Sequence, residues 1–210
     1  MGINFLIVAG AYLLGSIPSA VWIGKAAKGV DVREHGSKNA GTANTMRVLG
    51  VKTGIPVLLA DVFKGFAAVT LAFMSPDFES GTNAFVNFQL ILGAASVLGH
   101  VFPVFAGFRG GKGVATIVGI LLALHWQVTL VAIAVFFICL FISKYVSLSS
   151  LMMGFSFPIS VFFIFKTDSI SLKIFSVVVC ILLFITHRKN ISRLLHGKEN
   201  KATFLFKDKK

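Results

Sequence analysis

The chain has 210 residues, of which 56% are hydrophobic and 13% are charged, and its formal net charge is +12. Soluble domains contain about 25% charged residues, so this composition excludes an ordinary water-soluble protein. Together with the mean hydropathy of +0.86, it predicts an all-α integral membrane protein. Cys139 and Cys180 both lie in apolar runs, and we expect neither a disulfide nor a metal pair from them.

Seven apolar segments follow one another along the chain, and we expect seven transmembrane helices in a single polytopic domain, residues 1–210. The segments cover residues 3–24, 54–74, 85–106, 113–126, 127–143, 148–166 and 170–187. A straight span needs about 20 residues, and the fourth and fifth segments are shorter. A five-span alternative therefore stays open, in which these two segments form a re-entrant pair. The first segment lacks a basic n-region, which favours a retained span over a signal peptide.

The basic residues predict the orientation. With the N-terminus outside, residues 25–53, 107–112, 144–147 and 188–210 face the cytoplasm, and they hold 17 of the 20 Lys and Arg residues. Cytoplasmic loops are enriched in these residues. We therefore expect an N-out, C-in topology with a basic cytoplasmic tail at about 188–210. This topology places the polar stretches, and with them an active site, on the cytoplasmic face.

The first polar stretch, GSKNAGTANTMR, covers residues 36–47. Ser37 offers a hydroxyl, Asn39 and Asn44 offer amides, and Arg47 can clamp an oxyanion with two hydrogen bonds. Gly36 lets the backbone fold tightly. Such residues also dominate ordinary exposed turns, but this connector is about 30 residues long, and loops of that length are usually functional or disordered. Apolar residues are interspersed in it, which argues against disorder. We therefore expect a ligand site.

The second stretch, GFRGGKG at residues 107–113, has the composition of an anion site. Its glycines, Gly110, Gly111 and Gly113, would let backbone N–H groups approach a ligand closely. Arg109 and Lys112 add positive charge, and a helix N-terminus is expected directly afterwards. It is not a Walker A loop, because Lys112 is followed by glycine rather than Ser or Thr. The alternative is an ordinary positive-inside loop with glycine turns.

Further polar residues lie near the chain end and within the spans. If the last helix continues past His187, then His187 and Asn190 lie three residues apart on one helix face; the alternative is a basic tail on anionic lipid, which we adopt for residues 198–210. We expect Asp61 and Lys64 to neutralise one another as structural support. Pro18 and Pro103 should kink the first and third spans. There is no carboxylate cluster suited to Mg²⁺ or Zn²⁺, which predicts no metal site.

In chain order, the motifs AYLLGSIPSA, GSKNAGTANTMRVLG, DVFKGF, GHVFPVFAGFRGGKGVAT, KYVSLSS and HRKNISRLLHGKEN resemble the bacterial acyl-phosphate:glycerol-3-phosphate acyltransferases. The resemblance runs from about residue 11 to 200. It implies a seven-span, multi-pass enzyme of the bacterial cytoplasmic (inner) membrane. This enzyme moves a fatty acyl group from acyl phosphate to the 1-hydroxyl of glycerol 3-phosphate, giving lysophosphatidic acid and phosphate. It implies no cofactor, no metal and no acyl-CoA, and as partners the two substrates and membrane lipids, with no nucleic acid.

Carried over by position, the resemblance implies roles for individual residues. The activity-bearing set is Ser37, Arg47, Lys112, His187 and Asn190. The phosphate-binding set is Gly36, Asn39, Asn44, Arg109, Gly110, Gly111, Gly113 and Ser150. Glu199 is structural by the same resemblance. The chain departs from the family pattern at Ala43, where Thr is frequent, and at Lys38, where Gly is common.

Two other classes of protein compete with an acyltransferase. A transporter of organic phosphates would also need basic loops on one face, but it should carry binding residues near the membrane midplane, often in broken helices or repeats. Only Asp61, Lys64 and His100 come close to that pattern. A scaffold for other enzymes would explain neither glycine-containing loop.

Overall fold

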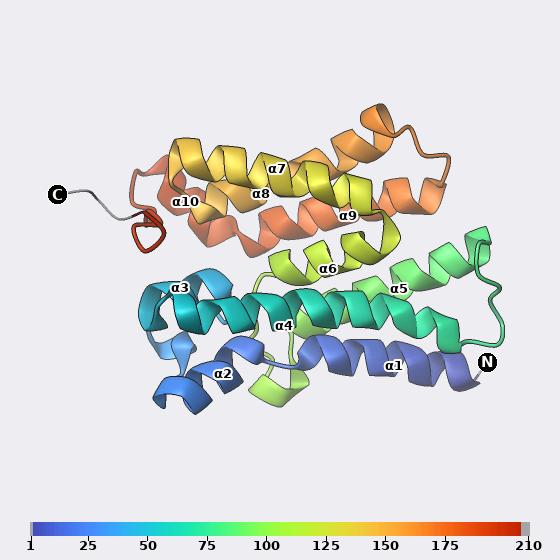
Figure 1. Cartoon of the computed structure of the whole chain (residues 1–210), viewed down its shortest axis with the longest axis horizontal. Helices are drawn as coiled ribbons and strands as arrows, with labels where there is room; N and C mark the ends of the chain where they lie inside the picture. The colour runs from blue at the N-terminus through green and yellow to red at the C-terminus, as the bar shows by residue number, and fades with distance from the viewer. Residues whose placement is uncertain (1, 207–210) are drawn as a thin grey trace. The chain divides into compact units, whose positions relative to one another are not determined.

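The computed structural model describes residues 2–206, which fold into helices and connecting turns without a β-strand (Figure 1). This confirms the all-α prediction. The chain divides into two compact units with a boundary between Leu124 and His125, and each unit is described by itself.

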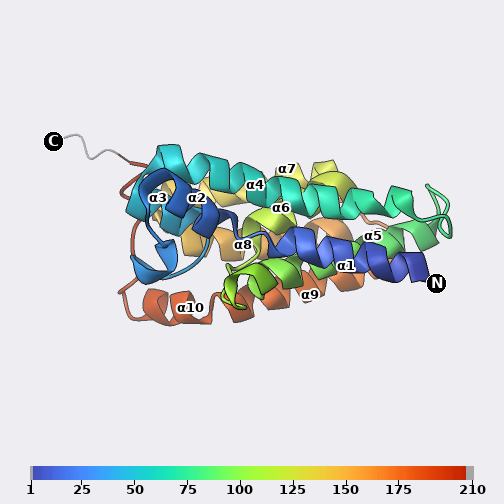
Figure 2. The same ribbon diagram turned by 90° about the horizontal axis from the view of Figure 1, so that it is seen from below.

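The first unit is built around four packed helices. Its elements are α1 (Gly2–Ser16), α2 (Ser19–Lys28), η1 (Val32–Glu34), α3 (Thr42–Leu49), α4 (Val51–Thr70), η2 (Leu71–Met74), α5 (Asn83–Val101), η3 (Val104–Ala106) and α6 (Val114–Leu124). Helix α1 packs on α4 and α5, and α4 packs on α6 (Figures 1 and 2). The expected kink at Pro18 is a complete break between α1 and α2, because proline cannot donate the helical hydrogen bond.

Glycines bring the helix backbones of the first unit into direct contact. A Cβ on Gly65 of α4 would collide with the Thr116 carbonyl of α6, and one on Gly119 would collide with the Val62 carbonyl of α4. Gly15 of α1 lies in the same way against the backbone of Ser96 in α5. Small residues at such crossings are the usual means of close helix packing in a bilayer. They hold α6 against α4, and α1 against α5, within this unit.

The second unit contains three long helices and a short one. Its elements are α7 (Trp126–Ser143), α8 (Val146–Ile159), the π-helical turn η4 (Ser160–Ile164), α9 (Ile170–Thr186) and α10 (Arg188–Leu195). Helix α8 packs on α7 and α9, and the rings of Phe157 and Phe175 meet edge to face with centroids 6.3 Å apart. Pro158 precedes the π-helical turn, at a position where the helical hydrogen-bond pattern is interrupted.

The helix after the last apolar segment changes direction at His187. Helix α9 ends at Thr186, close to the predicted end of the 170–187 segment, and α10 departs from it at 62°. Residues 199–206 make packing contacts within the second unit, and the contact of the 198–210 tail with lipid stays a prediction. The N–H of Ala202 donates to the Lys144 carbonyl at 2.8 Å, and Lys144 Nζ lies 3.7 Å from the centre of the Phe206 ring. Residues 207–210 of the predicted tail lie outside the described residues.

Helix lengths between Gly2 and Phe206 bear on the number of spans. Five segments are long and apolar enough to cross a bilayer: Gly2–Lys28, Val51–Met74, Asn83–Ala106, Trp126–Ser143 and Val146–Ile164. The bent pair α9–α10 can form a sixth. Helix α6 has 11 residues, which is about 16 Å at 1.5 Å per residue, or about half of the roughly 30 Å hydrocarbon core. The integral membrane class agrees with these helices, and the count of seven stays a prediction.

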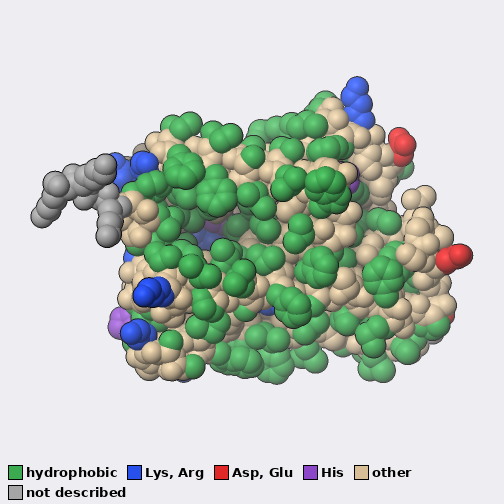
Figure 3. Space-filling view, in the orientation of Figure 1, with side chains coloured by type: hydrophobic (Ala, Val, Ile, Leu, Met, Phe, Trp, Pro, Cys, Tyr) green, Lys and Arg blue, Asp and Glu red, His purple; other side chains and the backbone are tan. Residues whose placement is uncertain are grey.

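The surface of both units is apolar. Figure 3 shows hydrophobic side chains over the visible faces of the helices, with Lys and Arg gathered at the end of the first unit that carries α2 and α3. Large side chains such as Phe63 (69% exposed), Ile142 (80%) and Phe163 (72%) point outward. A soluble monomer rarely exposes so much apolar surface. Lipid is the medium that this surface fits.

Candidate active site

The connector between α2 and α4 is organised by one buried amide. Asn44 is 1% exposed; its Nδ2 donates to the carbonyls of Val32 (2.7 Å) and His35 (3.1 Å), and its Oδ1 accepts from the Ser37 N–H at 2.8 Å. Gly36 has a φ of +58°, and a Cβ there would press on Asn44 Oδ1. Both donors of Asn44 are therefore used to shape the loop, which differs from the ligand contact we expected of them.

The other predicted residues of this connector surround the loop that Asn44 shapes. Ser37, Asn39 and Arg47 are partly exposed, and Arg47 lies in the last turn of α3. Lys38 has a φ of +59°, a left-handed conformation that glycine adopts more readily, which explains why glycine suits this position. The hydroxyl of Thr42, next to Ala43, is buried and has no hydrogen-bond partner among residues 2–206.

The 107–113 loop has a different structural basis from the expected one. The N–H of Gly110 donates to the Val101 carbonyl (3.2 Å), and the N–H of Gly111 donates to the His100 carbonyl (3.1 Å). A Cβ on Gly110 would collide with the His100 carbonyl, and one on Gly111 would collide with the His100 ring. The fold therefore already uses the two N–H groups that we expected to face a phosphate. These glycines are required by the close approach to α5.

Positive charge and the helix start remain as predicted around this loop. Arg109 is exposed and Lys112 is partly exposed. Gly113 has a φ of +87°, and α6 begins at the next residue, so its first-turn N–H groups have no helical acceptors. A cationic side chain next to such a helix start is a suitable place for an anion.

Two contacts join the connector between α2 and α4 to the 107–113 loop and the residue before it. The carbonyl of Ala40 lies 2.7 Å from the position of a Cβ on Gly111. Arg33 Nη1 donates to the Ala106 carbonyl at 2.8 Å, and its other guanidinium nitrogens hold Asp31 in a bidentate pair. The hydrogen bond from Arg33 is the main reason why the pKa of Asp31 falls from 3.8 to about 2. The 31–47 connector and the 107–113 loop thus form one continuous polar region of the first unit.

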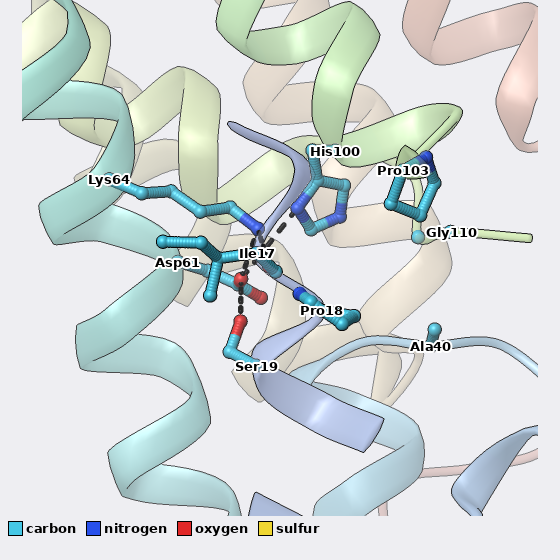
Figure 4. A pocket seen from close by; sticks show the side chains of 10 residues that line it. Ile17, Pro18, Ser19, Ala40, Asp61, Lys64, His100, Pro103 and Gly110 are labelled. Atoms are coloured by element: carbon cyan, nitrogen blue, oxygen red, sulfur yellow. Dashed lines mark hydrogen bonds and ion pairs between the residues drawn. The ribbon is translucent and has the colours of Figure 1, made fainter. Parts of the chain in front are cut away.

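A buried cluster of ionisable side chains lies behind these loops (Figure 4). Asp61 (2% exposed) and Lys64 (4%) of α4 form an ion pair at 2.8 Å. Ser19 donates to the same carboxylate oxygen, and Lys64 Nζ also donates to the Ile17 carbonyl at 3.0 Å. His100 Nδ1 lies 3.7 Å from Asp61 Oδ1 and 3.1 Å from Thr116 Oγ1. The cluster therefore connects the α1–α2 break with α4, α5 and α6.

In the second unit, Glu199 gathers three side chains. Its carboxylate accepts from Ser147 Oγ (2.9 Å), Asn190 Nδ2 (2.7 Å) and Arg193 Nε (2.7 Å). Burial alone would raise the pKa of Glu199, but the hydrogen bonds from Arg193, Asn190 and Ser147 outweigh it and lower the pKa. This geometry agrees with the structural role expected for Glu199. It also shows that one Asn190 donor is used to hold the chain end.

His187 and Ser150 are buried in the same unit. His187 is 2% exposed, and its Nδ1 lies 2.8 Å from the Leu183 carbonyl, so Nδ1 carries the proton in the neutral ring. Ser150 is 3% exposed and donates to the Val146 carbonyl at 2.9 Å. Asn190 follows His187 after the bend, and its N–H donates to the His187 carbonyl at 2.8 Å. His196 is exposed and lies apart from this buried pair.

No group of three or more His, Cys, Asp or Glu side chains within residues 2–206 is arranged to hold a metal ion. Cys139 and Cys180 are both free thiols.

A family model described as Glycerol-3-phosphate acyltransferase matches residues 5–197. The chain belongs to this family. A glycerol-3-phosphate acyltransferase of Fusobacterium nucleatum is 46% identical over 95% of this chain and 98% of its own length. One of Bacillus subtilis is 43% identical over 95% and 98%. Two crystal structures of PlsY (YgiH), an integral membrane glycerol 3-phosphate acyltransferase, cover 97% of this chain and 99% of their own at 37% identity. They represent a glycerol 3-phosphate form (TM-score 0.86) and a lysophosphatidic acid form (0.84).

One arrangement in the first unit was not predicted from the sequence. From the sequence we expected Asp61 and Lys64 to pair as structural support, and we did not connect them with His100. The structure brings these three residues into one cluster against the 107–113 loop. The available signal was three ionisable residues inside apolar segments, where such residues are rare.

Proposed function

We propose that this integral membrane protein transfers a fatty acyl group from acyl phosphate to the 1-hydroxyl of glycerol 3-phosphate. Acyl transfer to glycerol 3-phosphate follows from membership of the family, and the transporter alternative finds no support among the relatives. Acyl phosphate as the donor, the 1-hydroxyl as the acceptor and the absence of a cofactor are the proposal. The observation that carries it is the near-complete match to structures in glycerol 3-phosphate and lysophosphatidic acid forms.

The chemistry requires little from the protein beyond orientation. Acyl phosphate is a mixed anhydride with phosphate as a good leaving group. The glycerol oxygen forms a bond to the carbonyl carbon, the bond from that carbon to the phosphate oxygen breaks, and a phosphate oxygen takes the hydroxyl proton. Holding two reactants together can supply most of the rate enhancement for such a step. We assign Ser37, Arg47 and Lys112 to orientation and charge neutralisation.

The phosphate contacts follow from the groups that the fold leaves exposed. With the N–H groups of Gly110 and Gly111 already paired, we place the phosphate of glycerol 3-phosphate near Lys112, Arg109 and the start of α6. Asn39 is a further proposed phosphate contact, and Gly36, Asn44 and Gly113 shape the backbone around it. His187, Asn190 and Ser150 remain proposed site residues of the second unit on the basis of the family resemblance.

We also propose seven spans in the bacterial inner membrane, as one polytopic domain, with N-out, C-in orientation. No Lys or Arg lies between residues 65 and 108, so the basic residues of the first unit belong to its α2–α3 end, its span α4 and the 107–113 loop. By the positive-inside rule that end is cytoplasmic. The orientation is the same whether α6 and α7 both cross or form a re-entrant pair, because both arrangements return the chain to the cytoplasmic side.

The test of the proposal is donor choice. We expect the purified protein to form lysophosphatidic acid from glycerol 3-phosphate and acyl phosphate, to give no product with acyl-CoA, and to keep its rate in EDTA. Product from acyl-CoA, or activity lost in EDTA and restored by Mg²⁺, would contradict it.

The roles of the loops are tested by steady-state kinetics. Arg47→Ala should lower kcat by about 10²-fold or more, as loss of other transition-state charge stabilisers does. Lys112→Ala should change both kcat and the KM for glycerol 3-phosphate, because its ammonium can neutralise ground-state and transition-state charge. If Arg47→Ala shifted only that KM, Arg47 would be a binding clamp. Lys52→Ala, outside the proposed site, is the matched control.

A further inference from the structure

The stability of the fold does not account for the buried ion pair of Asp61 and Lys64. Both side chains are almost fully buried, at 2% and 5% exposure, inside the apolar segment Val51–Met74. Ionisable residues within membrane segments are costly and usually functional. A buried ion pair is also weak support for stability, because an apolar pair of similar volume is often as stable. The contacts of the pair therefore indicate its role.

His100 transmits the position of this pair to the 107–113 loop. Nδ1 of the ring faces Asp61 and Thr116. Its Nε2 edge faces Gly111, where a Cβ would collide with it, and the His100 carbonyl accepts the Gly111 N–H. Thr116 belongs to the first turn of α6. The ring thus touches the chain immediately before and shortly after Lys112.

The space beside this network is too small for a substrate. The cavity next to it, lined by Ser19, Ala40, Asp61, His100 and Gly111 among others, has a volume of about 10 Å³. A cavity of about that size holds one water molecule. The network therefore contacts the loop backbone, and this cavity has no room for glycerol 3-phosphate.

We propose that Asp61, Lys64 and His100 are positioning residues for acyl transfer, which hold Lys112 and the start of α6 in the geometry that binds glycerol 3-phosphate. Lys64 fixes the Asp61 carboxylate, the carboxylate and Thr116 fix the His100 ring, and the ring and carbonyl of His100 fix Gly111. The inference rests on the proposed role of the 107–113 loop in binding glycerol 3-phosphate.

The decisive variant removes the charges without leaving one unpaired. Asp61→Asn combined with Lys64→Met keeps the side-chain volumes and should restore a thermal stability close to wild type, because neither charge remains buried alone. We expect its KM for glycerol 3-phosphate to rise by about 10-fold or more, since small displacements of binding groups have large effects. The KM for acyl phosphate should change much less. A folded double variant with the wild-type KM for glycerol 3-phosphate would overturn the proposal.

The ring is tested by a graded pair of substitutions. His100→Phe keeps the volume and removes both nitrogens, while His100→Gln keeps a polar group near the Nε2 position. We expect the KM for glycerol 3-phosphate to rise more in His100→Phe than in His100→Gln. If both variants keep the wild-type KM for glycerol 3-phosphate, His100 is not part of the positioning network.

Two reference variants separate this inference from the proposed function. Ser96→Ala, one turn earlier on α5, changes a fully buried hydroxyl without a partner among the described residues, so its KM values should not change. Gly111→Ala should raise the KM for glycerol 3-phosphate, because its Cβ would displace His100 and the Ala40 carbonyl. If Gly111→Ala has no effect, the loop does not serve the substrate and both proposals fail. If Gly111→Ala raises the KM for glycerol 3-phosphate and the Asp61, Lys64 and His100 variants do not, only the positioning network fails.

Discussion

Asp61 in the first unit and Glu199 in the second are both buried carboxylates that gather side chains from separate segments. Their cationic partners differ: the Lys64 side chain is 5% exposed, whereas the Arg193 side chain is 34% exposed. Asp61 lies within an apolar helix, and Glu199 lies in the irregular segment after α10. A buried partner cannot regain water when the carboxylate is lost, but a partly exposed one can. Each carboxylate contacts three side chains, but the expected costs of breaking the two clusters are very different.

The largest expected effect is that of Asp61→Asn alone. It leaves the Lys64 ammonium buried without a counter-ion, and breaking a buried pair in this way costs about 3–5 kcal/mol. We expect a large fall in the unfolding temperature in detergent, or loss of folded protein from the membrane. Glu79→Gln, at an exposed carboxylate of the same unit, is the control. An unchanged unfolding temperature for Asp61→Asn would show that burial does not distinguish the two clusters.

Glu199→Gln should have a smaller effect. The amide oxygen can still accept hydrogen bonds, but the charge opposite Arg193 is lost, and hydrogen bonds involving a charged group contribute about 1.5–3 kcal/mol. Because Arg193 can turn to water, we expect a moderate fall in unfolding temperature. We also expect faster proteolysis of residues 199–206, whose packing depends on this carboxylate. A loss as large as that of Asp61→Asn would contradict the comparison.

The smallest effect expected is a pH dependence. The folded-state pKa of Glu199 lies below its ordinary 4.5, so its stabilisation is present above that pH and is lost as the pH falls below it. Asp31, with a pKa lowered from 3.8 to about 2, loses its contribution in a lower window. The unfolding temperature should therefore fall with acid, and the fall should be shallower below pH 4.5 in Glu199→Gln and between pH 3.8 and about 2 in Asp31→Asn. Identical acid profiles for both variants and wild type would show that neither carboxylate matters.

The composition and apolar runs were sufficient to predict an all-α membrane protein, because lipid burial depends on long apolar segments. The motif spacing was sufficient for the family. The hydrogen bonds of the glycines were not predictable: the N–H groups of Gly110 and Gly111 donate to the carbonyls of Val101 and His100 in α5, and only the path of residues 100–111 reveals this. The end of the last span near His187 was predicted from its apolar run, but the 62° change of direction into α10 was not, because hydropathy carries no information on direction. Asn44 looks like a ligand-binding amide in the sequence, and its burial among backbone carbonyls appears only in three dimensions.

The contact between α4 and α6 has a consequence for biosynthesis. Helix α6 is too short to be held in a bilayer by its own apolar length, and Gly65 and Gly119 attach it to α4 through the backbone carbonyls of Thr116 and Val62. Since the chain emerges from the ribosome N-terminus first, α4 is already made when α6 follows. The earlier helix is thus available as a docking surface for a later segment that the lipid alone would not retain.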